Sequence, residues 1–358
     1  MTLVTGATGQ VGSASINALV AAYAMVRALV RRPSEFAAPE GVQVVQGSFD
    51  DDGTLAKALE GVDVMLLAGR DSPNAVSQNQ RVLTHARRAG VRHIVKVSAI
   101  GASPESPIAL MREHHEIDEE IRKGPAAWTL LKPHLYMQNL LRAADAVRRE
   151  GRLAAPMGRD RFPLVDTSDV GAAAAVVLDN PAAHAGKAYS LTGPVAHSYD
   201  EVATALATVA GLAVAYEPVT PEDFESRLLA TGIPDWRAFD LAHIASAYNS
   251  AENAVSPDLA MLLGRNPGRS LSFSKTTMTP FPPDRLRVSD VPEMNLRPGR
   301  HSVEVVQPKN EKALIAATIV VDKPAHNTLL TTGRAGYLRT IRRQWAARKS
   351  QRQAASSR

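Results

Sequence analysis

A glycine-rich loop at the start of the chain limits the fold more than any other feature of the sequence. Residues 5–12 read TGATGQVG, directly after a short apolar stretch and directly before a helical pattern. In that setting Gly6 allows a tight turn, Gly9 lets the backbone approach a pyrophosphate, and Gly12 permits close packing of helix on strand. The N–H groups of the first helical turn then face the phosphates. The loop predicts a dinucleotide site, against the alternative of a plain turn without a ligand.

The residues after this loop alternate between short apolar runs and helical patterns. Such alternation predicts parallel strands joined by right-handed crossover helices, in an α/β fold with a Rossmann-type doubly wound sheet. The runs show no polar–apolar alternation, which is typical of strands covered on both faces. Strands are expected at 3–5, 26–30, 42–45, 62–68, 93–98 and 128–131, with helices at 11–23, 54–59, 76–89 and 108–123.

The composition changes twice along the chain. Residues 1–140 are expected to form the nucleotide-binding domain, its sheet completed by later segments to about residue 195, and residues 141–273 a smaller α/β lobe. From Lys275 onward 16 Lys and Arg stand against 6 Asp and Glu, out of 41 and 36 in the whole chain, so a tail of net charge +10 follows a body of −5. Residues 274–358 are Pro-rich and predicted to be partly disordered. A fused or frameshifted extension is favoured over a tail that binds nucleic acid or another polyanion.

The absence of cysteine excludes several kinds of site. With none in 358 residues, the chain has no thiolate nucleophile, no disulfide and no cysteine-bound metal, which fits a reducing compartment. The longest apolar stretches, 170–178 and 313–321, are too short to span a bilayer. The opening MTLVT meets the glycine loop at once, so no signal peptide is expected. We expect a cytoplasmic protein without membrane contact.

The end of the second predicted strand indicates which dinucleotide is bound. The chain there reads ALVRRP, with Arg31 directly after the strand. An acidic side chain at this point would bind the adenosine ribose and repel a 2′-phosphate, whereas arginine attracts the phosphate. Arg31 therefore predicts NADP(H) in preference to NAD(H), against the alternative that Arg31 and Arg32 are a solvated charge pair.

Five segments of the body together resemble a known family. These are the glycine loop, RRP at 31–33, GSFDD at 47–51, LKPHLYMQN at 131–139 and FPLVDTSDV at 162–170. In combination they resemble the NmrA-like branch of atypical short-chain dehydrogenases/reductases, with members such as azoreductases and quinone reductases. The resemblance runs from residue 2 to about residue 272. It implies a bound NADP(H) and a small-molecule substrate, and leaves a homodimer open.

The resemblance also implies roles for particular residues. Ala68 and Gly69 would lie beside the cofactor ribose, Ser98 near the nicotinamide, and Tyr136 and Asn139 near the substrate. Ser48 stands where relatives often have an aspartate that touches adenine, so adenine recognition departs from the family pattern here. The implied cofactor-binding residues are Gly6, Thr8, Gly9, Gln10, Val11, Gly12, Arg31, Ser48, Phe49, Ala68, Gly69, Ser98, His114 and Pro133.

The catalytic pattern of the wider superfamily is missing. Typical short-chain reductases carry Tyr-x-x-x-Lys on the helix after the fifth strand, where the tyrosine transfers a proton and the lysine lowers its pKa. Here Leu110 replaces the tyrosine and His114 the lysine. Leucine transfers no proton, so ketone or alcohol chemistry is not expected, whereas a quinone-like or azo-type acceptor needs a hydride and takes its proton from water. The candidate catalytic residues are His114, Tyr136 and Asn139.

Several alternatives stay open at this point. His114 either binds a ribose or donates a proton near neutral pH, or it is a solvated helix residue. No metal is expected, because His114 and Asp118 supply only two ligands. An NADPH-dependent reductase is favoured by Tyr136, Asn139 and the second lobe. The alternative, a non-catalytic protein that senses NADP(H) and reports to a protein partner, is favoured by the missing Tyr-x-x-x-Lys.

Overall fold

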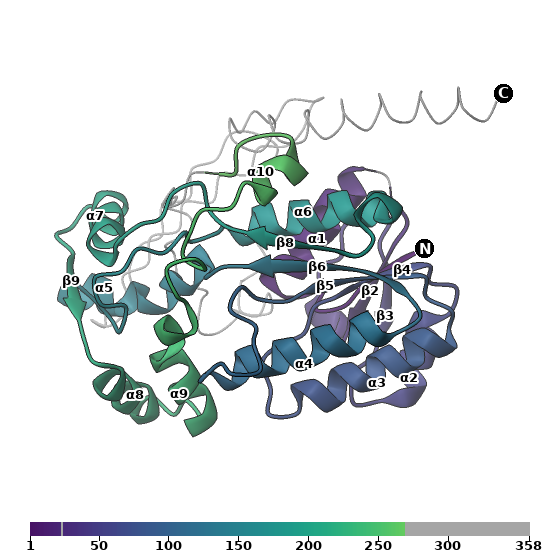
Figure 1. The fold of residues 1–358 in the computed structure, drawn as a ribbon, viewed down its shortest axis with the longest axis horizontal. Coiled ribbons are helices and arrows are strands. Elements are labelled where there is room, and N and C mark those ends of the chain that lie inside the picture. Colours follow the sequence, from purple (N-terminus) through teal and green to yellow (C-terminus); the bar gives the residue numbers. More distant parts are fainter. Residues whose placement is uncertain (23, 269–358) are drawn as a thin grey trace, which may run out of the picture. The chain divides into compact units, whose positions relative to one another are not determined.

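A parallel sheet forms the centre of the computed structural model, which describes residues 1–22 and 24–268. Seven strands lie in the order β3-β2-β1-β4-β5-β6-β8, and every neighbouring pair runs parallel (Figure 1). This confirms the doubly wound Rossmann-type fold. The strands are β1 Thr2–Val4, β2 Val26–Val30, β3 Gln43–Gln46, β4 Val64–Leu67, β5 His93–Val97, β6 Ala127–Pro133 and β8 Lys187–Leu191.

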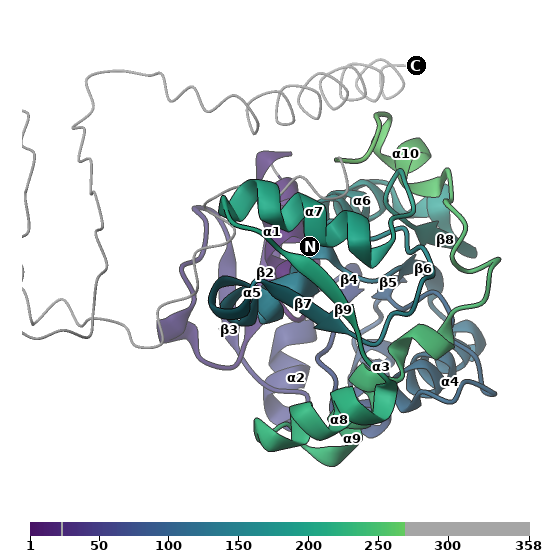
Figure 2. The same cartoon turned by 90° about the vertical axis from the view of Figure 1, so that its left-hand side faces the viewer.

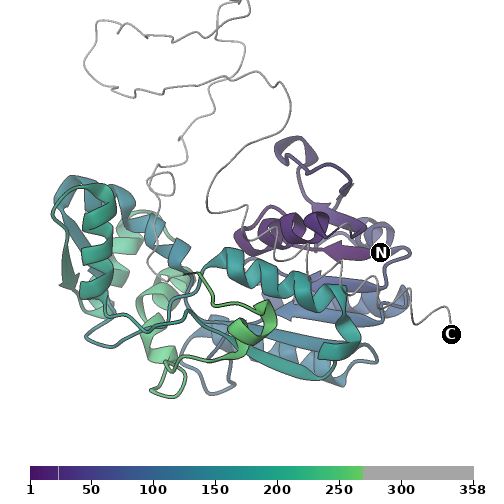
Figure 3. The ribbon, with the colours of Figure 1, turned by 90° about the horizontal axis from the view of Figure 1, so that it is seen from above.

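Helices cover both faces of this sheet. α1 (Gln10–Ala21) and α6 (Thr167–Asp179) lie on one face, and the other three lie on the opposite face (Figures 1 and 3). α1 and α6 approach closely at Gly171, where a Cβ atom would overlap Ala14. The three helices of the opposite face are α2 Asp52–Leu59, α3 Ala75–Arg88 and α4 Ala109–Lys123.

Burial explains why the predicted strands form. The side chains of Leu3, Met65 and Val95 are at most 1% exposed, because helices pack on both sides of the central strands. β3 differs: it lies at the sheet edge and has only Val45 buried. Each strand predicted between residues 3 and 131 forms, with shifts of a few residues at the ends.

A second group of elements lies beside the sheet. β7 (Arg152–Ala155) and β9 (Ala215–Pro218) form a separate parallel pair (Figure 2). Phe162 and Tyr199 belong to the core of this group, with ring centroids 6.1 Å apart. The accompanying helices are α5 Ala144–Glu150, α7 Tyr199–Ala210, α8 Pro221–Ala230 and α9 Asp235–Ala242, with 3-10 helices at Pro33–Glu35, Met137–Ala143, Pro181–His184 and Ile244–Ala247.

The chain then returns to the main sheet. α10 (Asp258–Leu263), which sequence patterns did not indicate, packs against α6 and β8. Beyond it, the buried Asp169 accepts hydrogen bonds from the Arg265 guanidinium and, at 2.6 Å, from the Gly268 backbone N–H. The division at residues 140 and 273 stays a prediction, and the expected basic extension at 274–358 lies outside the described residues. None of the helices within 1–22 and 24–268 has the length and apolar character needed to cross a membrane.

Candidate cofactor and substrate site

The predicted site residues meet at one edge of the sheet. Because all strands are parallel, the segments that follow them emerge on the same side: the glycine loop after β1, Ala68 after β4, Ser98 after β5, and Arg31 after β2. The strand order reverses between β1 and β4, so this edge is the switch point at which such sheets bind ligands.

The glycine loop has the geometry of a pyrophosphate cradle. Gly6 has a φ of +59°, and a Cβ atom there would lie 2.7 Å from the carbonyl oxygen of Ala68. A Cβ atom at Gly12 would overlap the carbonyl of Gly6. At Gly9, which precedes the first turn of α1, a Cβ atom would meet only the Gly6 oxygen, at 3.1 Å, and otherwise points into open space. The loop therefore leaves room for a ligand only beside Gly9.

Thr5 fixes this loop to the neighbouring strand, which sequence reasoning did not anticipate. The Ala68 N–H donates to Thr5 Oγ1 at 2.9 Å. The threonine hydroxyl in turn faces the carbonyl oxygens of Leu66 and Ala68, at 3.0 and 2.9 Å. Thr5 is fully buried, so the two segments on either side of the switch point are held in register.

The two arginines after β2 have different surroundings. The Arg32 guanidinium pairs with Glu35 at 2.8 Å. Arg31 is exposed and makes no ion pair with any residue that the structure describes; only its backbone oxygen accepts a bond, from Gln46. The binding of a 2′-phosphate by Arg31 stays a prediction.

The predicted adenine segment after β3 is held by its own turn. Ser48 Oγ accepts from the Asp50 N–H at 3.2 Å, and the Ser48 N–H donates to Thr54. Phe49 packs against the core on the side of α2 and α3. The Asp50 carboxylate accepts from the Gln78 side-chain amide at 3.0 and 3.1 Å. The segment is ordered by these contacts and lies at the same edge as Arg31.

A buried polar cluster lies where β5 and β6 approach α4. Lys96 Nζ is 3.2 Å from Asp118 Oδ1 and 2.9 Å from Nδ1 of His114. Asp118 Oδ2 accepts from the Ser98 hydroxyl at 2.6 Å and lies 4.0 Å from Nζ of Lys132. Lys96 and Asp118 side chains are only 3% and 1% exposed. We call these five residues the Lys96–Asp118 cluster.

The cluster sets the protonation of His114. Burial, reinforced by the positive charges of Lys96 and Lys132, lowers the pKa of His114 well below its usual value. Burial also lowers the pKa of Lys96, against the opposing effect of Asp118. His114 is therefore neutral at pH 7, not a solvated helix residue. Sequence reasoning placed Ser98 and His114 near the cofactor but missed Lys96, although a lysine inside the apolar run Ile94–Val97 was the available signal.

The predicted substrate residues, Tyr136 and Asn139, lie at the N-terminal end of the 3-10 helix Met137–Ala143. Tyr136 directly precedes that helix, and burial, with a smaller effect of Asp71, raises its pKa above the usual value. Asn139 is exposed. Asp71, just beyond β4, forms an ion pair with Arg237 of α9 at 3.3 Å, which connects the sheet edge to the second group of elements.

Two further contacts join the same regions. Asp240 of α9 accepts from the backbone N–H groups of Ala109 and Leu110 at 3.0 and 2.9 Å, at the start of α4. His134, next to Pro133, stacks on Tyr248 with centroids 4.3 Å apart. α9 and the segment after it are therefore positioned beside the carboxyl edge, where a substrate would meet the cofactor.

Glu113 is the most perturbed carboxylic acid near this edge. Burial, with the negative charges of Asp240 and Asp71, raises its pKa to about 7. It precedes His114 on α4. Its protonation therefore changes near neutral pH, which no sequence pattern indicated.

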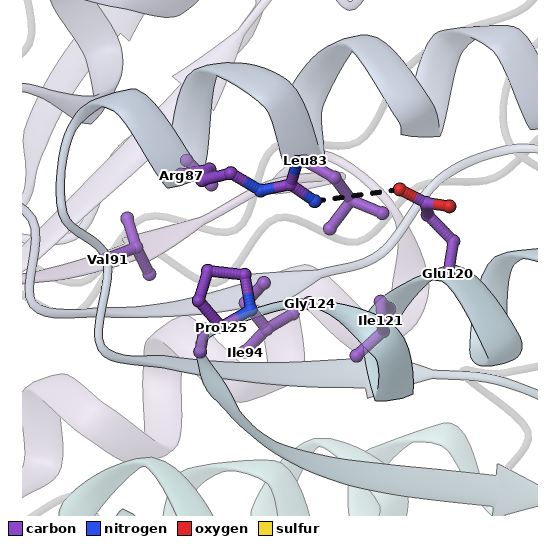
Figure 4. Close-up of a pocket in the computed structure, with 10 residues that line it drawn as sticks. Leu83, Arg87, Val91, Ile94, Glu120, Ile121, Gly124 and Pro125 are labelled. Carbon is purple, nitrogen blue, oxygen red and sulfur yellow. Dashed lines mark ion pairs between the residues drawn. The ribbon is translucent and has the colours of Figure 1, made fainter.

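A small pocket lies at the opposite edge of the sheet (Figure 4). It opens between the ends of α3 and α4, beside the start of β5, with an ion pair of 3.7 Å between Arg87 and Glu120. The glycine loop follows the other end of β1, so this pocket is separate from the candidate site. Within residues 1–22 and 24–268, no three His, Asp or Glu side chains are grouped to hold a metal ion.

Comparisons with known proteins identify the family of the chain and similar solved structures. The model of the NmrA-like family matches residues 1–263. An NAD(P)H azoreductase from Xenophilus azovorans is 35% identical over 261 residues, 72% of this chain and 88% of that protein. The NADPH complex of an NADPH-dependent quinone oxidoreductase from Escherichia coli superposes with a TM-score of 0.69 at 30% identity, over 76% of this chain and 97% of that one. The triphenylmethane reductase of a Citrobacter species, in complex with NADP(H), gives 0.65 and 30%, over 75% and 97%.

Proposed function

The chain belongs to the NmrA-like family, whose model matches residues 1–263, and on this premise we propose that it is an NADPH-dependent reductase that passes a hydride to a quinone-like or azo-type acceptor. The azoreductase and the quinone oxidoreductase among its relatives support this choice of acceptors. The family model matches residues 1–263, a span that contains every residue of the candidate site.

The residues at the carboxyl edge fit the cofactor. The open side of Gly9 and the N-terminus of α1 receive the pyrophosphate, and Arg31, exposed and without an ion pair to other described residues, binds the 2′-phosphate. Ala68 and Ser98 border the same edge. When bound, the nicotinamide supplies the hydride, and the chain orients the acceptor against it.

One observation carries this proposal: three features lie together at the carboxyl edge of the sheet. They are the glycine loop, the exposed Arg31, and the Lys96–Asp118 cluster. His114 of that cluster stands where the superfamily has its catalytic lysine. Leu110, at the tyrosine position, packs against the apolar cluster that includes Ile108 and Met111, and it contributes no proton. An acceptor reduced at a conjugated carbon or nitrogen gives a delocalised anion that is less basic than the alkoxide from a simple ketone, so it can take its proton from an acid other than the missing tyrosine.

NADPH oxidation in the presence of a panel of quinones and azo dyes tests the proposal. Turnover is expected with NADPH and at least one acceptor, and none with the Gly9→Val variant. NADPH binding without turnover of any acceptor would instead support the second candidate, a protein that senses NADP(H). That candidate is favoured only by the missing Tyr-x-x-x-Lys pattern at Leu110 and His114.

Two finer points belong to the same proposal. We place the protein in the cytoplasm, because NADPH is used there and the chain contains no cysteine. We also propose a homodimer as the assembly to test, and light scattering of the purified chain measures it directly.

A further inference from the structure

Hydride transfer alone does not complete the proposed reduction, because the reduced acceptor must also be protonated. A hydride added to a quinone gives an oxyanion, and one added to an azo bond gives a nitrogen anion, so each product needs a proton. The superfamily's tyrosine would deliver it, but Leu110 stands in that position. The inference below rests on the proposed function and concerns where this proton comes from.

The contact between Lys96 and His114 fixes the tautomer of the histidine. An ammonium group has three donors and no acceptor. With Lys96 Nζ 2.9 Å from Nδ1 of His114, the ring nitrogen Nδ1 must accept. A neutral imidazole carries a single N–H, which therefore lies on Nε2, the side of the ring that faces away from Lys96.

We propose that Lys96 and His114 form a proton relay that protonates the reduced acceptor. The N–H bond at His114 Nε2 breaks as the acceptor oxygen or nitrogen takes its proton. At the same time an N–H bond of the Lys96 ammonium breaks, and that proton binds His114 Nδ1. The acceptor gains one hydride from the nicotinamide and one proton from the relay. His114 ends neutral with its proton on Nδ1, and Lys96 ends as a neutral amine. After the product leaves, Nε2 of His114 takes a proton from solvent and Nδ1 returns its proton to Lys96, which restores the starting state.

The relay solves a problem that His114 alone cannot. Neutral imidazole that loses its Nε2 proton without replacement becomes an imidazolate, which is far too basic to form near pH 7. A proton from Lys96 at Nδ1 avoids that species. The true acid is then the lysine, whose pKa burial and Lys132 lower from its usual value. A lowered pKa brings a lysine closer to the range in which general acids are effective.

Asp118 holds Lys96 in place for this role. Its Oδ1 lies 3.2 Å from Lys96 Nζ, and its Oδ2 accepts from Ser98 at 2.6 Å. The contact of Asp118 with the Lys96 ammonium opposes the lowering of the Lys96 pKa by burial. Asp118 and Ser98 thus act as positioning residues, whereas His114 touches the acceptor.

A proton relay and a purely structural role for Lys96 can be distinguished by comparing two acceptors, a dye and a quinone, in two variants of Lys96. A cationic triphenylmethane dye becomes a neutral product by taking a hydride alone, so its reduction needs no proton; a quinone needs both. Lys96→Met removes the relay. Lys96→Arg keeps a positive charge and a donor toward His114, but a guanidinium does not give up its proton.

We expect both variants to lower kcat for the quinone by about 10²-fold, the contribution typical of general acid catalysis. Reduction of the dye should stay within about twofold of wild type, because the barrier for that acceptor includes no proton transfer. NADPH affinity should also be unchanged. Rescue of quinone reduction by Lys96→Arg would overturn the relay, since a structural cation would then suffice. An equal loss with both acceptors, or no loss with either, would overturn it too.

Nitrogen-15 NMR of the histidine rings gives a readout that does not depend on turnover. In the wild-type chain His114 should show an unprotonated Nδ1 and a protonated Nε2, and Lys96→Met should lose this preference. Should Lys96→Met fail to fold, the double variant Lys96→Met/Asp118→Asn removes both buried charges and serves in its place. A protonated Nδ1 in the wild type would refute the relay, whereas wild-type inactivity with every acceptor would refute the proposed function itself.

Discussion

The strands β5 and β6 carry buried polar side chains at both ends, and the two ends are built differently. At the carboxyl end, the Lys96–Asp118 cluster is charged. At the amino end, His93 Nε2 lies 2.9 Å from Thr129 Oγ1, and the Thr129 hydroxyl donates to the carbonyl of His184 at 2.7 Å. Burial lowers the pKa of His93, so this second group is neutral.

This difference fits a structural role for the neutral group and the proposed functional role for the Lys96–Asp118 cluster. A buried neutral group with paired donors and acceptors costs little and fixes the packing. A buried ion pair is costly to desolvate and often adds no stability. The charged group occurs only where the strands end beside the glycine loop, the edge that binds ligands in such sheets. The amino edge holds the neutral group and the small pocket of Figure 4.

The largest expected effect is the loss of cofactor binding when the glycine loop at the carboxyl edge is changed. Gly9→Val should abolish binding of NADPH and NADH, because its side chain would occupy the open space beside the loop, while circular dichroism stays as in wild type. Gly12→Val is the contrasting control, since its Cβ atom would overlap Gly6 and unfold the loop. Titration calorimetry measures the binding. NADPH binding by the Gly9→Val variant would mean that the ligand lies elsewhere.

Removing one buried charge should lower the free energy of unfolding more than breaking the neutral group does. Asp118→Leu leaves Lys96 buried without its counter-ion, and the free energy of unfolding should fall by about 3–5 kcal/mol. Thr129→Val removes the hydroxyl that pairs with His93 Nε2 and with the His184 carbonyl, and should lower the free energy of unfolding by about 1–3 kcal/mol. Urea denaturation followed by fluorescence compares the two. Equal losses would remove the energetic distinction between the two strand ends.

The arginine at the carboxyl edge should affect one cofactor only. Arg31→Ala should weaken NADPH binding by about 1–3 kcal/mol, the range of a charge-assisted hydrogen bond, and leave NADH binding unchanged. Arg32→Ala is the matched control, because Arg32 already pairs with Glu35. An equal loss for both dinucleotides in Arg31→Ala would contradict the assignment of the 2′-phosphate.

A pH dependence of stability is expected from Glu113. Its pKa rises from 4.5 in the unfolded chain to about 7 in the folded one, so the folded state holds the proton more tightly. Stability is then highest below pH 4.5 for this group and falls as the pH rises from about 4.5 to 7. Glu113→Gln should flatten this part of the curve of Tm against pH. A curve identical to wild type would show that Glu113 titrates normally.

The smallest expected effect is that of removing the basic extension after Phe273 on NADPH affinity. A chain that stops at Phe273 keeps the bonds of Arg265 and Gly268 to Asp169, and should bind NADPH with wild-type affinity. A chain that stops at Gly264 loses both bonds and should have a lower Tm. A tenfold loss of NADPH affinity at Phe273 would make the basic extension part of the binding unit.

Local pattern was enough to predict the sheet and much of its ligand-binding edge. The runs at 26–30 and 94–97 are apolar apart from Arg27 and Lys96, and such runs are typical of strands that helices cover on both faces. Because parallel strands end at one edge, the positions of Gly9 and Arg31 in the sequence already place them together. α10 escaped prediction because its six residues are too short for a helical period to be recognised.

The sequence by itself determined the fold, the glycine loop and the position of Arg31 at the end of β2, because each depends on residues close together in the chain. Tertiary structure decided the chemistry of His114. Lys96 and Lys132 lie on separate strands, and Asp118 lies one helical turn beyond His114. Only the packing of α4 on the sheet brings these four side chains together and buries Lys96 and Asp118. Burial and the proximity of charges set a pKa, and for these residues both depend on contacts between segments that are far apart in the sequence.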